Sequence, residues 1–397
     1  MALRSRVTAR RHSLATGPAS TVSAVVLIYG TTFDKSGRSG LPVRGHGRPR
    51  PVRILDGADG MHDYAAAALV ALDWGTSSCR AYLVRSDGGV LAERSGSTGV
   101  MQINETARRE GTAAGEIFDR TLRALCADWI TELGELPIIA SGMIGSDQGW
   151  STAPYLDVPV DPLNRPVELH PVRSSLGTVY IVPGLIDRSG LPGVMRGEET
   201  QVVGALLADR ATTSADVTAG ERTLVLPGTH SKWVEVVDGS VTGFTTHMTG
   251  ELFALVMSHS IVSRLAEPAA EPRWDAFDRG LDTVAGEEGR LGLVGTLFSA
   301  RSLVLTGDLD GAGVTDYVSG LIIGGEIRSM AGLGSGRAAR RIGLLGSAAL
   351  CARYSRALTR VGIDAEVLDA DSAPRALAHF AREAGLIDRQ TPEREPA

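Results

Sequence analysis

The sequence predicts an α/β protein in which two similar domains flank a cleft. Three observations support this prediction. A strand–turn–strand pattern occurs twice, helical segments follow each copy, and the length of 397 residues leaves room for two or three domains. The composition, 43% hydrophobic and 22% charged, is that of a globular chain that can form more than one core.

The repeated pattern consists of an apolar strand, a tight turn with Gly and Thr, a return strand and an Asp-Gly hairpin. The first copy comprises residues 69–78, residues 79–84 and Asp87-Gly88, and the second comprises residues 224–231, residues 232–237 and Asp238-Gly239. Because the two copies share order and spacing, we expect them to form equivalent parts of two sheets.

Each tight turn leaves backbone N–H groups and hydroxyls at the end of a sheet, which is a way to bind phosphate without a P-loop. Two facing copies would hold one polyphosphate from both sides, so the repeat indicates an ATP-dependent enzyme. A single hydroxyl is better explained by turn structure, and the inference depends on the group. The candidate phosphate-binding residues are Gly75, Thr76, Ser77, Ser78, Gly228, Thr229, His230 and Ser231.

Asp73 closes the first apolar strand directly before its Gly-Thr turn. A carboxylate at this place can hold a hydrated Mg²⁺ beside phosphates. The alternative is an aspartate that caps its own turn. The presence of two such turns favours the metal, bound through water.

The remaining elements follow the same order in both halves. The first half predicts a third strand at 89–94, a helix over about 107–133, a strand at 136–140, a loop over 147–171, a strand at 178–183 and a helix that opens at 194–201. Residues 210–222 are small and polar, which is typical of a domain boundary. The second half predicts helices at 250–265, 315–333 and 347–361 and a strand at 342–345.

The run Arg196-Gly197-Glu198-Glu199 opens one of these helices. Gly197 permits close approach of the backbone, and the helix N-terminus stabilises the carboxylate form. A base that accepts a hydroxyl proton needs that form at neutral pH. An ordinary acidic first turn is the more economical interpretation of these residues alone.

Other candidates each carry an alternative. Gly320, Gly324 and Gly325 would let a helix pack closely under a nucleotide, and Gly346-Ser347 would contact adenosine or cap a helix. In the loop, Trp150 and Tyr155 would stack on a sugar or cover a core edge.

Composition and missing motifs exclude several classes. The net charge of −6 gives no reason to expect nucleic acid or a membrane surface. The sequence has no P-loop, no G-x-G-x-x-G after a strand, no G-x-S-x-G and no Cys/His cluster. Three scattered cysteines fit a reducing cytoplasm.

The two ends of the chain differ from the rest. Residues 1–62 are basic and rich in Gly, Pro and Ser, and we expect a disordered or artefactual extension, with a natural start near Met61. Its apolar run at 22–29 is too short to span a bilayer. The alternative is the core of a signal peptide, but the run lacks a clear small-residue cleavage site. Residues 390–397 are expected to form a disordered tail.

The ordered motifs resemble the 2-dehydro-3-deoxygalactonokinase family over residues 64 to about 385. That family belongs to the sugar kinase, Hsp70 and actin superfamily. The motifs that carry the resemblance are residues 72–76, 141–146 with Gly149-Trp150 and Pro154-Tyr155, 194–201, 227–233 and 248–252.

The resemblance implies two RNase-H-like (actin-like ATPase) domains that flank an ATP cleft. The first, at 63–221, would hold the sugar acid, and the second, at 222–389, would hold adenosine. The implied reaction is ATP- and Mg²⁺-dependent phosphorylation of 2-dehydro-3-deoxy-D-galactonate on its 6-hydroxyl, a cytoplasmic step of galactose breakdown. By the same resemblance, Asp73 with residues 75–78 and residues 227–231 are the phosphate motifs, and residues 345–347 fall at the adenosine motif.

The resemblance also places Glu198 as the catalytic base, which reverses the interpretation from the residues alone. Weaker candidates for sugar-acid contact are Gly142, Met143, Trp150, Tyr155 and Arg196, because a substrate carboxylate needs a cationic or amide partner. Alternatives are a kinase of the same fold for another sugar acid such as 2-dehydro-3-deoxygluconate, a non-enzymatic nucleotide switch, and a phosphatase of the same fold. The sequence leaves the oligomeric state open, a homodimer included.

Overall fold

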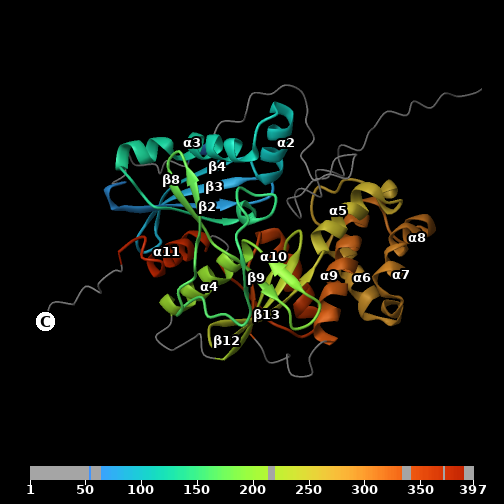
Figure 1. Cartoon of the computed structure of the whole chain (residues 1–397). Coiled ribbons are helices and arrows are strands. Elements are labelled where there is room, and N and C mark those ends of the chain that lie inside the picture. The colour runs from blue at the N-terminus through green and yellow to red at the C-terminus, as the bar shows by residue number, and fades with distance from the viewer. Residues whose placement is uncertain (1–52, 55–63, 213–219, 333–340, 370–371, 389–397) are drawn as a thin grey trace, which may run out of the picture. The chain divides into compact units, whose positions relative to one another are not determined.

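The computed structural model of the chain describes residues 53–54, 64–212, 220–332, 341–369 and 372–388 (Figure 1). The predicted extension at 1–62, apart from Arg53–Ile54, and the predicted tail at 390–397 lie outside the described residues. Within the described residues, 252–325 form one compact unit, and those up to 251 and from 326 onward form the other. The division at residue 221, which follows the sequence repeat, stays a prediction.

The first sheet has the strand order β1-β4-β3-β2-β5-β8-β7. Strands β2, β3 and β4 form an antiparallel meander, and β5 and β8 then run parallel to β2. Strands β1 and β7 add antiparallel edges. The bounds are β1 Arg53–Ile54, β2 Ala67–Trp74, β3 Cys79–Arg85, β4 Val90–Gly96, β5 Ile138–Gly142, β7 His170–Ser174 and β8 Gly177–Ile181.

The second sheet repeats this plan in the order β13-β12-β11-β14-β15. Its first three strands are an antiparallel meander, and β14 and β15 are parallel to β11. The bounds are β11 Glu221–Leu226, β12 Ser231–Val237, β13 Ser240–His247, β14 Arg341–Leu344 and β15 Ala365–Val367. Both sheets therefore contain the RNase-H-like order third-second-first-fourth-fifth, which confirms the predicted fold class.

Three segments differ from their predictions. The helix expected over 250–265 ends at His259 as α5 (Thr249–His259), and a 3₁₀ segment, η3 (Val262–Leu265), follows it. The helix expected over 107–133 is two helices, α2 (Val100–Glu110) and α3 (Ala114–Leu133), separated at Gly111, where φ is 68°. A left-handed residue ends a helix, and glycine adopts that conformation without strain. The loop expected over 147–171 contains β6 (Tyr155–Asp157), which joins β9 (Gly184–Asp187) and β10 (Gly193–Met195) in a small sheet.

The core of the larger unit lies on both faces of the first sheet. Alternate residues of β2 point to opposite faces: Val70, Leu72 and Trp74 pack in a cluster with α2 and α3, whereas Leu69 and Ala71 pack in a second cluster. The second cluster also contains residues of α4 (Glu198–Thr212), α11 (Ala373–Glu383) and the second sheet. Figure 1 shows α3 and α11 on opposite sides of β2 and β3. Helix α10 (Ala348–Arg360) packs against β14 and β15.

The unit at 252–325 is helical. It contains α6 (Trp274–Ala285), α7 (Gly292–Leu297), α8 (Ser299–Thr306) and parts of α5 (Thr249–His259) and α9 (Val314–Gly332). A Cβ built at Gly320 would lie 2.1 Å from the Phe277 carbonyl oxygen, so α9 packs closely against α6 as its glycines predict. No helix among the described residues has the length and apolar character needed to cross a membrane.

Short 3₁₀ segments complete the element list: η1 Tyr64–Ala66, η2 Met143–Gly145, η3 Val262–Leu265, η4 Glu287–Leu291 and η5 Gly311–Gly313.

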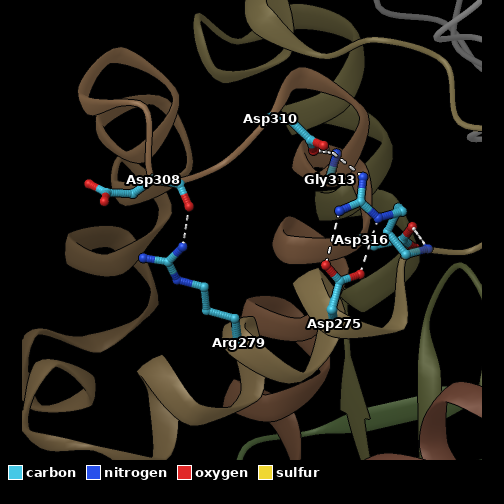
Figure 2. A network of polar contacts seen from close by, with 7 residues as sticks. Asp275, Arg279, Asp308, Asp310, Gly313 and Asp316 are labelled. Carbon is cyan, nitrogen blue, oxygen red and sulfur yellow. Dashed lines mark hydrogen bonds and ion pairs between the residues drawn. The ribbon is translucent and has the colours of Figure 1, made fainter.

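A polar network fixes the starts of α6 and α9 in this helical unit. Arg273 binds Asp275 at 2.9 Å and Asp310 at 2.8 Å. The Arg273 backbone N–H donates to Asp316 at 2.7 Å, and the Gly313 N–H donates to Asp310 at 2.9 Å. Figure 2 shows the Asp275 and Asp310 carboxylates directed at one guanidinium group. The Arg273 cation keeps the pKa of Asp275 and of Asp310 below the ordinary aspartate value.

Candidate active site

The first Gly-Thr turn is fixed by the helix that follows the meander. The Gly75 N–H donates to the Ser78 carbonyl at 2.9 Å, and the Gly75 and Thr76 carbonyls accept from Val100 and Met101 of α2, each at 3.1 Å. The side chains of Thr76, Ser77 and Ser78 are exposed. The turn is therefore rigid in its backbone and presents three residues with hydroxyls to solvent.

The second turn is fixed in the same way. The Thr229 carbonyl accepts from the Glu251 N–H, in the first turn of α5, at 3.0 Å. The His230 Nε2 atom is hydrogen-bonded to Glu251 Oε2 at 2.6 Å. The likeness of the two hairpins thus extends to the helix that follows each third strand. The shared crevice between the two turns stays a prediction.

Ser231 differs from the hydroxyls of the first turn because it is buried. A carboxylate beneath the turn, Glu326 of α9, accepts from Trp233 Nε1 at 2.6 Å, from the Tyr354 hydroxyl at 2.7 Å and from the Thr249 hydroxyl. Because Tyr354 gives its proton to Glu326, the Ser231 hydroxyl donates to Tyr354 at 2.8 Å. The hydroxyl is engaged in the core, and its phosphate contact stays a prediction.

Sequence reasoning missed Glu326, although its place in an otherwise apolar stretch of helix was a signal. A buried carboxylate is costly unless its oxygens are hydrogen-bonded. With its donors on β12, α5 and α10, Glu326 ties these three elements together under the second turn.

Two glycines bring the start of α4 against the end of the first sheet. Gly142 pairs with Trp74 across β5 and β2, and a Cβ at Gly142 would lie 2.7 Å from the Trp74 carbonyl oxygen. A Cβ at Gly197 would lie 3.1 Å from the Gly142 Cα. Their φ angles, 93° and 107°, also favour glycine. The expected close approach at Gly197 is confirmed.

Glu198 follows Gly197 and reaches the second hairpin. Its Oε1 atom lies 3.0 Å from Nζ of Lys232, the second residue of β12, and its Oε2 atom accepts from the Arg196 N–H at 3.1 Å. The Glu198 side chain is 28% exposed and that of Lys232 is 4% exposed. The predicted base therefore connects the ends of β2 and β5 with the start of β12. Sequence reasoning did not assign Lys232, one of two lysines in the chain.

Glu199 has the opposite environment to its neighbour. It is buried, and its Oε2 atom accepts from the Gly197 N–H at 2.6 Å. Burial, with a smaller contribution from the Glu198 charge, raises the pKa of Glu199 to about 8. Adjacent carboxyls whose environments differ in this way suit different roles, and the accessible one is Glu198.

Arg196 is buried beside the predicted sugar-acid loop. Its Nη2 atom donates to the Ala153 carbonyl at 2.7 Å, and its guanidinium lies 4.3 Å from the centre of the Tyr155 ring. Its Nε and Nη1 atoms are buried without a hydrogen-bond partner among the described residues. A buried cation with two unpaired donors can accept an anionic ligand.

The aromatic residues of the loop have different surroundings. Trp150 stacks on Phe118 with ring centres 5.6 Å apart and packs against the first-sheet core, which is the alternative role that its sequence left open. Tyr155 is 38% exposed, and its ring bears the Arg196 guanidinium. Met143 is half-buried in the 3₁₀ turn after β5. Sugar contacts of all three stay predictions.

The predicted adenosine motif lies beside the second phosphate turn. The Leu345 N–H donates to Val225 at 2.9 Å, and a Cβ at Gly346 would lie 3.2 Å from the Pro227 carbonyl oxygen. Ser347 caps α10, and its side chain accepts from the Leu350 N–H at 3.4 Å. The cap is confirmed, and contact of Gly346, Ser347 and Gly325 with nucleotide stays a prediction.

Asp73 lies at the end of β2, next to its last residue, and its role in holding a metal stays a prediction. The Asp73 side chain is 23% exposed and binds Arg80 Nη2 through Oδ2 at 2.7 Å. Among the described residues, no group of three or more His, Cys, Asp or Glu side chains is arranged to hold a metal. A single partly exposed carboxylate still fits Mg²⁺, which keeps most of its waters and uses one or two protein carboxylates.

The duplicated sheet and its paired Gly-Thr hairpins define the class of proteins with an actin-like ATPase fold. Comparison with known proteins specifies the family. A family model described as 2-keto-3-deoxy-galactonokinase matches residues 73–380, and the chain belongs to this family. As kinases, its members use ATP.

Two relatives with curated names carry the name of the same family. The protein named "Probable 2-dehydro-3-deoxygalactonokinase DgoK1" of Rhizobium meliloti (strain 1021) is 36% identical over 318 residues, which are 78% of this chain and 95% of that protein. The 2-dehydro-3-deoxygalactonokinase of Escherichia coli (strain K12) is 33% identical over 79% of this chain and 98% of its own length. A crystal structure of a Sinorhizobium meliloti protein assigned as a 2-dehydro-3-deoxygalactonokinase matches with a TM-score of 0.66 and 35% identity, covering 80% of this chain and 99% of that one.

Proposed function

We propose that this protein transfers the γ-phosphoryl group of ATP to the 6-hydroxyl of 2-dehydro-3-deoxy-D-galactonate. The observation that carries the proposal is the place of Glu198. Its backbone follows the glycine packed on the end of β5, and its carboxylate binds the lysine that follows the second Gly-Thr turn. An acceptor hydroxyl held at Glu198 would therefore lie near both predicted phosphate-binding turns.

In this proposal the base and the two turns have different roles. Glu198 accepts the proton of the sugar hydroxyl as the oxygen attacks phosphorus. The backbone amides and exposed hydroxyls of Gly75–Ser78 and Gly228–Thr229 stabilise the charge on the transferred group. Because their backbones are fixed by α2 and α5, these donors need little reorganisation during the reaction.

Asp73 would hold Mg²⁺ through a water molecule at the end of β2. The metal, when bound, neutralises phosphate charge. The Asp73–Arg80 pair, at 2.7 Å, fixes one oxygen of the carboxylate while the side chain stays partly exposed. The three buried free cysteines fit a cytoplasmic location.

Arg196 would bind the carboxylate of the sugar acid through its unpaired Nε and Nη1 donors. A hydrogen bond to a charged group contributes about 1.5–3 kcal/mol. Arg196→Ala should therefore raise KM for the sugar acid by roughly 10–100-fold and leave KM for ATP nearly unchanged. Arg188→Ala is the matched control, because Arg188 pairs with Asp157 on the surface. An unchanged KM for the sugar acid would remove Arg196 from this role.

The deciding experiment measures ADP release by the full-length protein with a panel of sugar acids. The proposal expects 2-dehydro-3-deoxygalactonate to give the highest kcat/KM. A preference for 2-dehydro-3-deoxygluconate would show the rival kinase, and sugar-independent turnover would favour a nucleotide switch. Glu198→Gln should lower kcat by roughly 10²–10⁴-fold while ATP still binds. Turnover near the wild-type rate in that variant would contradict the assignment of the base.

A further inference from the structure

The Lys232 ammonium group is buried at the junction of the second phosphate hairpin and α4. Its side chain is 4% exposed, and lysines are almost never buried to this extent unless they are paired. The Nζ atom lies 3.0 Å from Glu198 Oε1 and donates to the His230 carbonyl at 3.2 Å. One contact is with the proposed base and the other is with the backbone of the phosphate turn.

The two oxygens of Glu198 are held from two sides. Lys232 holds Oε1 from β12, and the Arg196 backbone N–H holds Oε2 from the segment before α4. A carboxylate oxygen has a second lone pair, so each oxygen can still accept a proton from a substrate. The contacts therefore fix the direction of the carboxylate without blocking it. Catalytic groups need this kind of support from surrounding residues.

Other charged groups around Glu198 do not replace the lysine. Glu199, on the same helix, has a pKa raised to about 8 by burial and is largely neutral near pH 7. The His230 ring is engaged with Glu251 of α5 at 2.6 Å. The Arg196 guanidinium is directed to the Ala153 carbonyl and the Tyr155 ring. Lys232 is the cation whose ammonium group contacts the Glu198 carboxylate among the described residues.

We propose that Lys232 is a positioning residue for phosphoryl transfer, which holds the Glu198 carboxylate aimed at the acceptor hydroxyl. The proposal rests on the proposed function, because it gives Glu198 the role of base. It also connects the second phosphate-binding turn with the proposed base. A shift of that turn would move the His230 carbonyl, which contacts Lys232, and Lys232 would in turn move Glu198. A purely structural ion pair would stabilise the fold without this effect on the reaction.

The test is a double-mutant cycle in the full chain with Lys232→Met, Glu198→Gln and the double variant, assayed for sugar-dependent ADP release. Lys232→Met should lower kcat by roughly 10–10³-fold, within the range typical of proton-transfer catalysis. If Lys232 acts through Glu198, the double variant should be no more than about 3-fold slower than Glu198→Gln, since groups that act as a unit are not additive. A double variant whose loss of kcat equals the product of the two single losses would overturn the proposal.

The pH profile of kcat/KM gives a readout that a structural role would not move. Removal of a cation 3.0 Å from the proposed base should move the acid limb in Lys232→Met to higher pH by about one unit or more. Lys232→Arg keeps the charge, so its acid limb should stay in place even if the bulkier group slows turnover. Equal shifts in the two variants, or none in Lys232→Met, would contradict the proposal.

Two controls separate the possible failures. Circular dichroism and thermal unfolding identify variants that do not fold, and if Lys232→Met unfolds, Lys232→Gln takes its place in the cycle while Lys232→Arg still tests the charge. Arg188→Met removes an exposed paired cation and should leave kcat and the pH profile unchanged. Wild-type protein inactive on every sugar acid would refute the proposed function. If the wild type is active, kcat of Glu198→Gln is low and kcat of Lys232→Met equals that of wild type, only the role of Lys232 is refuted.

Discussion

Glu198 and Glu199 are adjacent in the chain, yet the fold places their side chains in different environments. Glu198 is partly exposed and paired with Lys232, whereas Glu199 is buried with the Gly197 N–H as its hydrogen-bond donor. The helix N-terminus favours both charges, so burial makes the difference between them. The sequence shows two equal acids, and the structure shows that Glu198 is the accessible one.

Glu199 should make stability depend on pH. Its pKa is about 8 in the folded protein and near 4.5 when unfolded, so between these values the folded state holds a proton that the unfolded state has lost. The contribution of Glu199 to the free energy of unfolding therefore falls as pH rises from about 5 to 8, and it changes little above that range. Glu199→Gln removes this dependence and keeps an acceptor for the Gly197 N–H.

Urea unfolding at pH 5.5 and pH 8.5 checks this prediction. Relative to wild type, Glu199→Gln should gain about 1–3 kcal/mol of unfolding free energy on going from the lower to the higher pH. Thr112→Ala, which alters an exposed hydrogen bond to Glu116, serves as a control whose difference from wild type should not depend on pH. Parallel pH curves for wild type and Glu199→Gln would show that Glu199 is ionised in the folded state.

At the scale of elements, the sequence predicted what local patterns determine. Both hairpins were found, because alternation of apolar residues and Asp-Gly turns are local signals. The predicted helix at 315–333 and strand at 342–345 agree within a residue with α9 and β14. The helix break at Gly111 was missed, because apolar spacing alone does not show that a single glycine has turned left-handed.

The polar contacts of the site were less predictable because they join distant segments. Glu198 pairs with Lys232, and Glu326 receives donors from Trp233 and Tyr354. No spacing rule connects such positions. The motifs predicted which residues carry the chemistry, whereas the buried partners of those residues are visible only in the assembled fold.

At the scale of the molecule, the last described helix, α11, covers the first sheet, whose strands come early in the chain. Helix α11 packs on β2, β3 and β5 of the first sheet and against α4, which begins with the proposed base. A Cβ at Gly88, in the first hairpin, would lie 2.9 Å from the Arg375 Cα of α11. The described residues before 252 therefore need the C-terminal helix to cover their core.

Phe380→Ala tests this dependence. Phe380 is 3% exposed and belongs to the cluster that α11 shares with both sheets, so its truncation leaves a cavity and should cost about 3–5 kcal/mol of unfolding free energy. Phe298→Ala is the matched control, because Phe298 is 55% exposed and its truncation should change stability by about 0.5 kcal/mol or less. Because α11 packs against α4, we also expect Phe380→Ala to lose kinase activity at a lower temperature than Phe298→Ala. Equal unfolding free energies for the two variants would mean that α11 is not part of the core that supports the site.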